Sequence, residues 1–325
     1  MKTAFALLVF CCLLPIPGAA EIVSRSLQAE VRTIRTSNGP SEIESLLPPG
    51  HRFSLDVQYN TEIPEGAPPG EVLGHTGSYW MIGDWLIEDG AALGLAVGFG
   101  TIGFSDDHPS WDAVRFTADQ TQTFGVFGPA LLTGAAVVLS DSTRTALTST
   151  NLVSLPDLAA FSAGEFALSF HDYFGAGTEP IPRTIVLGRI LSLDRNPDRP
   201  VYQCQGFGAP LQQPLRIVRG VQRVLPLRAS LIDEAQSQVG ASLPSRPILR
   251  VLQTDGQLAR QRGMSFLELD GEEGSLVLRG GQWQYSLRGE AFPEAGSYLL
   301  WISSPDQNEY VIEPQCTLEV QVVDR

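Results

Sequence analysis

The chain has 325 residues, with 36 Asp or Glu against 22 Lys or Arg, so its formal net charge is -14. A negative field of that size repels phosphate backbones and anionic lipids, which argues against nucleic-acid binding and against electrostatic docking on a membrane. Residues 54–182 carry sixteen acidic residues and only two arginines, Arg115 and Arg144. Such a surface attracts divalent cations, but its simplest role is to keep an exported protein in solution.

Residues 1–20 have the three parts of a secretory signal peptide. Lys2 supplies a positive charge, residues 4–16 form an apolar stretch, and the small residues 17–20 suit a signal peptidase. We therefore expect cleavage after Ala20 and a secreted protein, extracellular or periplasmic. No other stretch reaches the roughly 18 apolar residues that span a bilayer, so we expect no transmembrane span in the mature chain.

The four cysteines form two groups with different expected fates. Cys11 and Cys12 should leave with the signal peptide; the alternative is a lipid anchor on one of them, although Val9-Phe10 rather than small residues precede Cys11. Cys204 and Cys316 remain, and a long-range pair in an exported protein predicts a structural disulfide. Closing a loop of that length would stabilise the fold by roughly 4–5 kcal/mol.

The composition predicts an all-β protein. The chain contains 32 glycines and 23 prolines, which interrupt short apolar runs and leave little room for long helices. Apolar and polar residues alternate over residues 53–57, 166–170 and 318–322, which predicts half-buried strands of antiparallel sheets. The least strand-like segment is 154–164, where residues 156–161 indicate a short helical turn or a loop.

A boundary between two domains is expected near residue 198. Residues 194–200 hold two prolines among charged residues and no apolar periodicity, as an interdomain linker does. We therefore expect a signal peptide (1–20), an acidic, jelly-roll-like β-sandwich domain (21–198) and an immunoglobulin-like β-sandwich domain (199–325). The last of these should contain strands near residues 216–218, 225–227, 248–252, 276–278, 298–302 and 318–323.

Catalytic motifs are weak in this sequence. Residues 98–103 fit a G-x-G-x-x-G dinucleotide pattern, but an acidic segment broken by Pro109 follows where the motif needs a helix. The four histidines form no metal-binding motif, and no serine lies in a G-x-S-x-G turn. We assign no catalytic residues; a secreted hydrolase remains an alternative and would need His75 or His171 beside a nucleophile or paired acids.

The richest cluster of functional side chains is residues 106–112. Asp106, Asp107 and Asp112 are candidate calcium ligands in a loop, and calcium is the only cofactor that we consider. Trp111 lies among them, and Trp80 and Trp85 accompany Asp84 on a neighbouring segment, so the three tryptophans are candidate platforms for stacking sugars. A solvated turn with a buried tryptophan is the simpler interpretation.

Several segments of the N-terminal region share a pattern with a known family, namely residues 51–59 and 77–80 near its start and residues 155–161, 166–170 and 188–193 near its end. In these segments the region resembles the opening and closing strands of the β-sandwich of bacterial exported proteins that carry PEP-CTERM sorting signals. The chain ends at Asp324-Arg325 without the sorting tripeptide, apolar span and arginine cluster, so the resemblance does not imply sorting by that route.

The C-terminal region contains two further segments with a family pattern, residues 202–207 and residues 224–231. In them the region resembles the PxKF domain, an immunoglobulin-like module of exported bacterial proteins. Residues 202–207 are similar to its opening strand, and residues 224–231 lie where its naming motif falls, with Arg228 in place of lysine and Ala229 in place of phenylalanine. The late strands correspond to residues 281–285, 296–298 and 316–320. The resemblance implies an architecture and an accessory role, and no catalytic residues.

Together these features predict a secreted, non-catalytic protein that acts by binding or display at the bacterial envelope. Its expected partners are an envelope polysaccharide or another surface protein. The alternatives are a calcium- or carbohydrate-binding adhesin and, in second place, the secreted hydrolase.

Overall fold

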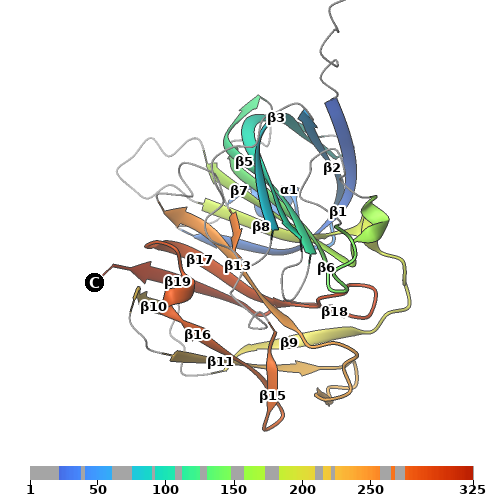
Figure 1. Cartoon of the computed structure of the whole chain (residues 1–325), viewed down its shortest axis with the longest axis vertical. Helices are drawn as coiled ribbons and strands as arrows, with labels where there is room; N and C mark the ends of the chain where they lie inside the picture. The colour runs from blue at the N-terminus through green and yellow to red at the C-terminus, as the bar shows by residue number, and fades with distance from the viewer. Residues whose placement is uncertain are drawn as a thin grey trace, which may run out of the picture.

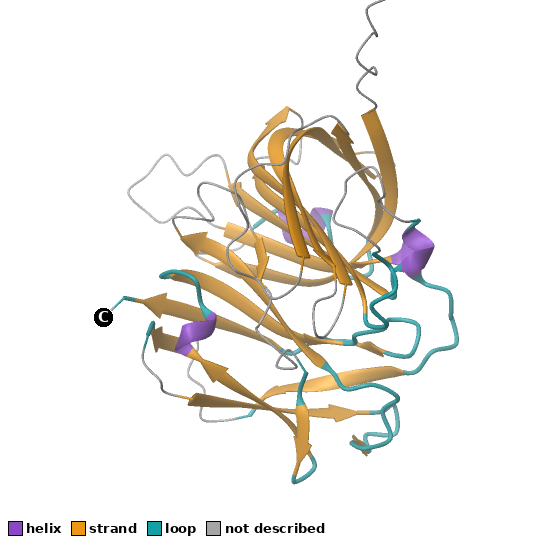
Figure 2. Cartoon of the chain, in the orientation of Figure 1, coloured by secondary structure: helices purple, strands orange, loops and turns teal. Residues whose placement is uncertain are grey.

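The computed structural model describes residues 22–37, 41–60, 75–89, 92–106, 112–124, 130–147, 157–172, 183–208, 215–220, 224–256, 265–267 and 275–324. Strands make up most of these residues, and the helical pieces are single turns (Figure 2). The all-β prediction is therefore confirmed. No helix in the described ranges is long and apolar enough to cross a membrane.

The elements fall into two groups along the chain. The first comprises β1 (Ile22–Ser37), α1 (Ile43–Leu46), β2 (Arg52–Asn60), β3 (His75–Asp89), β4 (Ala92–Asp106), β5 (Asp112–Phe124), β6 (Ala130–Asp141), β7 (Ala163–Asp172) and β8 (Arg183–Ile190). The second comprises β9 (Val201–Phe207), β10 (Leu215–Val218), β11 (Val224–Ile232), β12 (Gln238–Val239), β13 (Ile248–Gly256), β14 (Ser265–Leu267), β15 (Val277–Arg279), β16 (Gln282–Arg288), β17 (Gly296–Ser303), β18 (Val311–Ile312) and β19 (Thr317–Val323). Single 3-10 turns occupy Leu158–Ala160, Leu191–Leu193 and Gly289–Ala291.

The first group forms a closed barrel of eight antiparallel strands rather than the expected jelly-roll-like sandwich. Each strand pairs with its neighbour in the chain, and β8 returns to pair with β1, where Ala29 faces Ile190. A jelly roll would place distant strands side by side. Here every strand pairs with the next one in the chain, and the connections range from residues 90–91 between β3 and β4 to residues 142–162 between β6 and β7.

Alternate residues of β1, β2 and β5 to β8, the strands whose side chains the structure describes at least in part, fill the barrel interior. Phe53 and Leu55 of β2 are buried there, as the alternation predicted, together with Ile43 of α1. Gly188 of β8 lies opposite Phe166 of β7, and a methyl group at Gly188 would overlap the Phe166 ring. The glycine therefore provides the space in which this phenylalanine ring packs.

The second group forms a two-sheet sandwich, as expected, and it contains all six strands expected from the sequence. One sheet has the order β10-β19-β17-β13-β14, and the other has the order β15-β16-β11-β9-β18, with β12 beside β11. Buried residues from both sheets, including Trp283, Tyr298 and Leu318, make its core. The turn at Leu158–Ala160 also agrees with the expected short helical turn.

The sandwich is stacked on the outer wall of the barrel (Figure 1). Its β13–β17 face packs there through Trp301, Leu252 and Phe266. These side chains meet small or aliphatic side chains from the barrel strands, namely Ala113, Ala136, Val138, Ala167 and Leu187.

This stacking corrects one sequence expectation. Residues 166–170 were expected to form a half-buried strand, but every one of them is buried. The barrel core covers one face of β7, and the sandwich covers the face that the alternation assigned to solvent.

Candidate functional site

The three candidate calcium ligands are described to different extents by the structure. Asp112 begins β5 and is fully buried, and its Oδ2 accepts a hydrogen bond of 3.0 Å from the Leu147 amide. Asp106 is the last residue of β4, with its side chain outside the described part, and Asp107 also lies outside it. The described residues contain no group of three or more His, Cys, Asp or Glu side chains able to hold a metal. Calcium binding stays a prediction.

Asp112 has a structural partner that the sequence did not reveal. It faces Asp141 across β5 and β6. The Asp141 carboxylate accepts hydrogen bonds from the amides of Thr143, Thr145 and Ala146 at 3.0, 2.9 and 3.1 Å. Burial raises the pKa of this carboxyl, but the hydrogen bonds from Thr143 and Thr145 outweigh burial and leave it below its ordinary value. Both carboxylates thus hold the turn that follows β6.

The three candidate sugar-binding tryptophans all have side chains outside the described part of the structure. Trp80 and Trp85 lie on β3, paired with Thr101 and Ala96 of β4, and their side chains are outside the described part. Trp111 lies outside the described residues altogether. Sugar stacking on these residues stays a prediction.

The histidines of the hydrolase alternative have the same status. His75 pairs with Asp106 at one end of the β3–β4 ladder, and His171 pairs with Arg183 on β7 and β8. The side chains of both histidines lie outside the described part, so the hydrolase also stays a prediction.

Cys204 and Cys316 form a disulfide, with their Cα atoms 5.3 Å apart. Cys204 lies in β9 of one sheet, and Cys316 immediately precedes β19 of the other. The bond therefore ties the two layers of the sandwich together at its first and last strands.

A buried polar cluster lies between the barrel and the sandwich. Arg250 of β13 forms an ion pair of 2.8 Å with Glu165 of β7 and donates a hydrogen bond of 2.8 Å to Ser140 of β6. The Trp301 indole donates to the other Glu165 oxygen at 3.0 Å. Burial, together with the charge of Arg250, lowers the pKa of nearby Arg115 to about 10. Glu165 occupies a polar position of an alternating strand, and nothing in the sequence distinguishes it from a residue on the solvent face.

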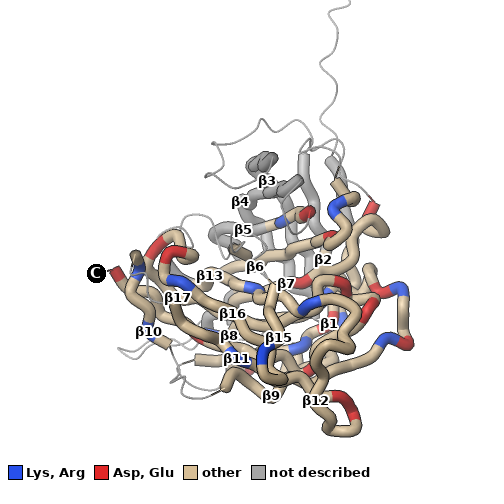
Figure 3. The backbone as a smooth tube through the Cα atoms, turned by 60° about the horizontal axis from the view of Figure 1, so that its bottom comes forward, with Lys and Arg blue, Asp and Glu red and all other residues tan. Residues whose placement is uncertain are grey.

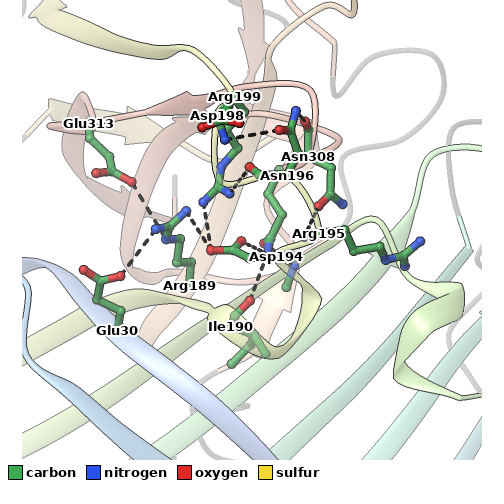
Figure 4. A network of polar contacts seen from close by, with 12 residues as sticks. Glu30, Arg189, Ile190, Asp194, Arg195, Asn196, Asp198, Arg199, Asn308 and Glu313 are labelled. Atoms are coloured by element: carbon green, nitrogen blue, oxygen red, sulfur yellow. Dashed lines mark hydrogen bonds and ion pairs between the residues drawn. The ribbon is translucent and has the colours of Figure 1, made fainter.

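A second polar network joins the two units at the edge of their interface (Figure 4). Arg189 of β8 contacts Glu30 of β1 at 3.3 Å and Asp194 at 3.3 Å, and it approaches Glu313 of the sandwich at 3.9 Å. Arg32 of β1 pairs with both Glu30 and Glu313. Basic and acidic segments consequently interleave beside β1 (Figure 3).

The segment expected to be a linker takes part in this network. Arg199 donates to Asp194 at 2.8 Å, and Gln307 of the sandwich donates to the other Asp194 oxygen at 2.6 Å. Burial raises the pKa of Asp194, against the opposing effects of Arg189 and Gln307. The charged residues that suggested an exposed connection thus contact both units. The domain boundary near residue 198 stays a prediction.

A groove of about 350 Å³ lies where β1 and β8 of the barrel meet the sandwich. We call it the junction groove. Its lining combines two arginines, one glutamate, several hydroxyl and amide side chains and an apolar wall, contributed by Arg35, Ser37, Arg183, Ile185, Thr254, Ser297, Tyr298, Leu299, Glu319, Val320 and Gln321. The volume lies at the lower end of the range of about 300–1,000 Å³ that is typical of small-molecule sites, and such sites favour the interfaces between domains.

The junction groove is larger than a hollow of about 170 Å³ on the β15–β16 surface. Sequence reasoning could not find it, because its residues come from five strands that are far apart in the chain. It is the candidate functional site. The chain matches no family model, no curated protein and no solved structure.

Proposed function

We propose that this protein is exported and acts without catalysis, by binding or displaying a ligand at the cell envelope or outside the cell. The observation that supports the proposal best is the junction groove, whose walls come from both units. The ion pairs between Arg250 and Glu165 and between Arg32 and Glu313 hold those walls in a fixed relation. A site preorganised in this way binds at a smaller conformational cost.

The disulfide supports the exported location. A bond between Cys204 and Cys316 persists in an oxidising compartment and is rare in the cytosol. The charged N-terminus and apolar segment of residues 1–20 support the same location. The resemblance to exported envelope proteins adds to this proposal, and an envelope polysaccharide or surface protein is the proposed partner.

Expression of the full chain in a bacterial host tests this function. We expect the protein in the periplasm or medium, with a new N-terminus after Ala20 and no free thiol by mass spectrometry. The purified protein should then retain glycans or an envelope fraction in a binding screen. A cytoplasmic protein with both Cys204 and Cys316 reduced would contradict the proposal.

A further inference from the structure

We propose that the junction groove binds a sugar that carries a single carboxylate, such as a hexuronate unit of an acidic polysaccharide. This inference rests on the proposed function and names the ligand class of the same site. It is carried by the charges and hydrogen-bonding groups that line the groove.

Arg35 is the first reason for an anionic ligand. It projects from β1 into the groove lining, and its Nε is buried without a hydrogen-bond partner. None of the ion pairs among the described residues involves Arg35. The Nε atom is buried too deeply for a ligand to reach, but Arg35 as a whole is only partly buried, so a bound carboxylate can pair with the outer part of its guanidinium in matching planar geometry.

Arg183 places a second guanidinium on the same wall. Arg35 pairs with Ile185 and Ser37 pairs with Arg183 in the β1–β8 ladder, so the two arginines are diagonal neighbours. Residues in that relation have their Cβ atoms within about 8 Å. Arg183 is held in place, because its Nε donates to Ser169 Oγ at 3.1 Å and its Nη2 donates to the Thr254 carbonyl. Two neighbouring cations create a local positive potential in a protein whose net charge is -14.

Glu319 limits the charge of the ligand. It lies on β19 and lines the same groove as the two arginines, so the formal charge of the lining is only about +1. A monocarboxylate suits that balance, whereas a dianionic phosphate would be repelled by Glu319. A carboxylate also presents the planar pair of oxygens that a guanidinium binds best.

The remaining lining residues suit a sugar ring. The Ser297 hydroxyl donates to the Gln321 carbonyl oxygen at 3.0 Å, which leaves the Gln321 amide nitrogen as a donor for a ligand. Ile185, which is only partly buried, supplies apolar surface on the barrel wall, against which the C–H face of a sugar can pack. The small volume favours a short segment or the end of a glycan over a long chain.

Titration calorimetry with galacturonate and galactose tests the proposal. The two sugars differ at one position, where galacturonate has a carboxylate and galactose a hydroxymethyl group. We expect the intact, disulfide-bonded protein to bind galacturonate at least tenfold more tightly than galactose. Arg35→Gln should weaken galacturonate binding at least tenfold and leave galactose binding unchanged, and Arg35→Lys should restore part of the loss.

Arg228→Gln is the matched control, because Arg228 is exposed on β11 of the opposite sheet of the sandwich and is not part of the groove lining. It should leave both affinities unchanged. Glu319→Gln removes the opposing charge and should strengthen galacturonate binding several-fold, which keeps the idea testable if the Arg35 variants do not fold. Equal affinity for the two sugars, tighter binding of inorganic phosphate, or galacturonate binding unaffected by Arg35→Gln would each overturn the proposal. Export and glycan retention are scored separately, so the proposed function can stand if this inference fails.

Discussion

Replacing Glu165 with glutamine should destabilise the whole protein. Glu165 is 5% exposed and Arg250 is 7% exposed, so their ion pair is almost completely removed from water. Glutamine has nearly the same shape and still offers an oxygen to the Trp301 indole, which now donates to Glu165 Oε1. The substitution therefore removes the negative charge next to Arg250 while leaving the packing almost unchanged.

The size of the effect follows from the geometry of the pair. At 2.8 Å and an effective dielectric constant of about 20, the Coulomb attraction is about 6 kcal/mol. Desolvation of both groups offsets part of this attraction, and removing one partner of a buried pair costs about 3–5 kcal/mol. We expect a loss in that range. The positive charge of Arg115 is close enough to interact with Arg250, and this repulsion adds to the cost.

Urea unfolding at neutral pH, followed by tryptophan fluorescence and far-UV circular dichroism, measures this loss. The Arg219–Asp324 pair provides a matched control, since its N–O distance is also 2.8 Å but its side chains are 39% and 62% exposed. Asp324→Asn should cost less than about 1 kcal/mol. A double-mutant cycle with Arg250→Gln should give a coupling energy of about 2 kcal/mol or more. Equal losses for Glu165→Gln and Asp324→Asn would refute the reasoning.

Three further predictions concern single features of the fold. Replacing both Cys204 and Cys316 with serine should lower the free energy of unfolding by roughly 4–5 kcal/mol, because the bond closes a loop of 112 residues; urea midpoints with and without the bond check this, and equal midpoints would contradict it. Asp141→Asn should lower stability at pH 7, and the difference from wild type should shrink as the pH falls below about 4. The reason is that a carboxyl with a lowered folded pKa loses its contribution to stability as it becomes protonated. A constant difference in the free energy of unfolding between pH 7 and pH 2 would count against this prediction. Gly188→Ala should lower the free energy of unfolding by about 1–3 kcal/mol or more, since its methyl group would overlap the Phe166 ring and the Glu30 carbonyl oxygen. Thermal or urea unfolding measures this loss. An unchanged melting temperature would show that the barrel wall shifts to accept the methyl group.

The sequence pattern predicted the strands and the sandwich of the second group, but it did not predict that β1 to β8 close into a barrel. Alternation correctly marked Phe53 and Leu55 as core residues, because a period of two depends only on which face of a strand is buried. A closed barrel and an open sandwich impose the same period, so alternation cannot distinguish them. The disulfide was predictable because Cys204 and Cys316 are the two cysteines outside the expected signal peptide.

The site was harder to predict than the fold. Glu165 and Ser169 occupy the polar positions of an alternating strand, which normally face solvent, yet both are buried because a second unit covers that face. Arg35 carries no sequence signal at all, since its importance comes from the strands that surround it. Side chains of this kind become recognisable only when the two units are seen together.

The alanines on the outer barrel wall restrict how this protein can evolve. Ala113, Ala136 and Ala167 give Trp301 and Phe266 the room to lie close against the strands. A larger residue on the barrel would require a smaller one on the sandwich, so substitutions on the two surfaces must be coordinated. Grafting either unit alone onto a different partner would therefore disturb this interface unless the facing residues were changed with it.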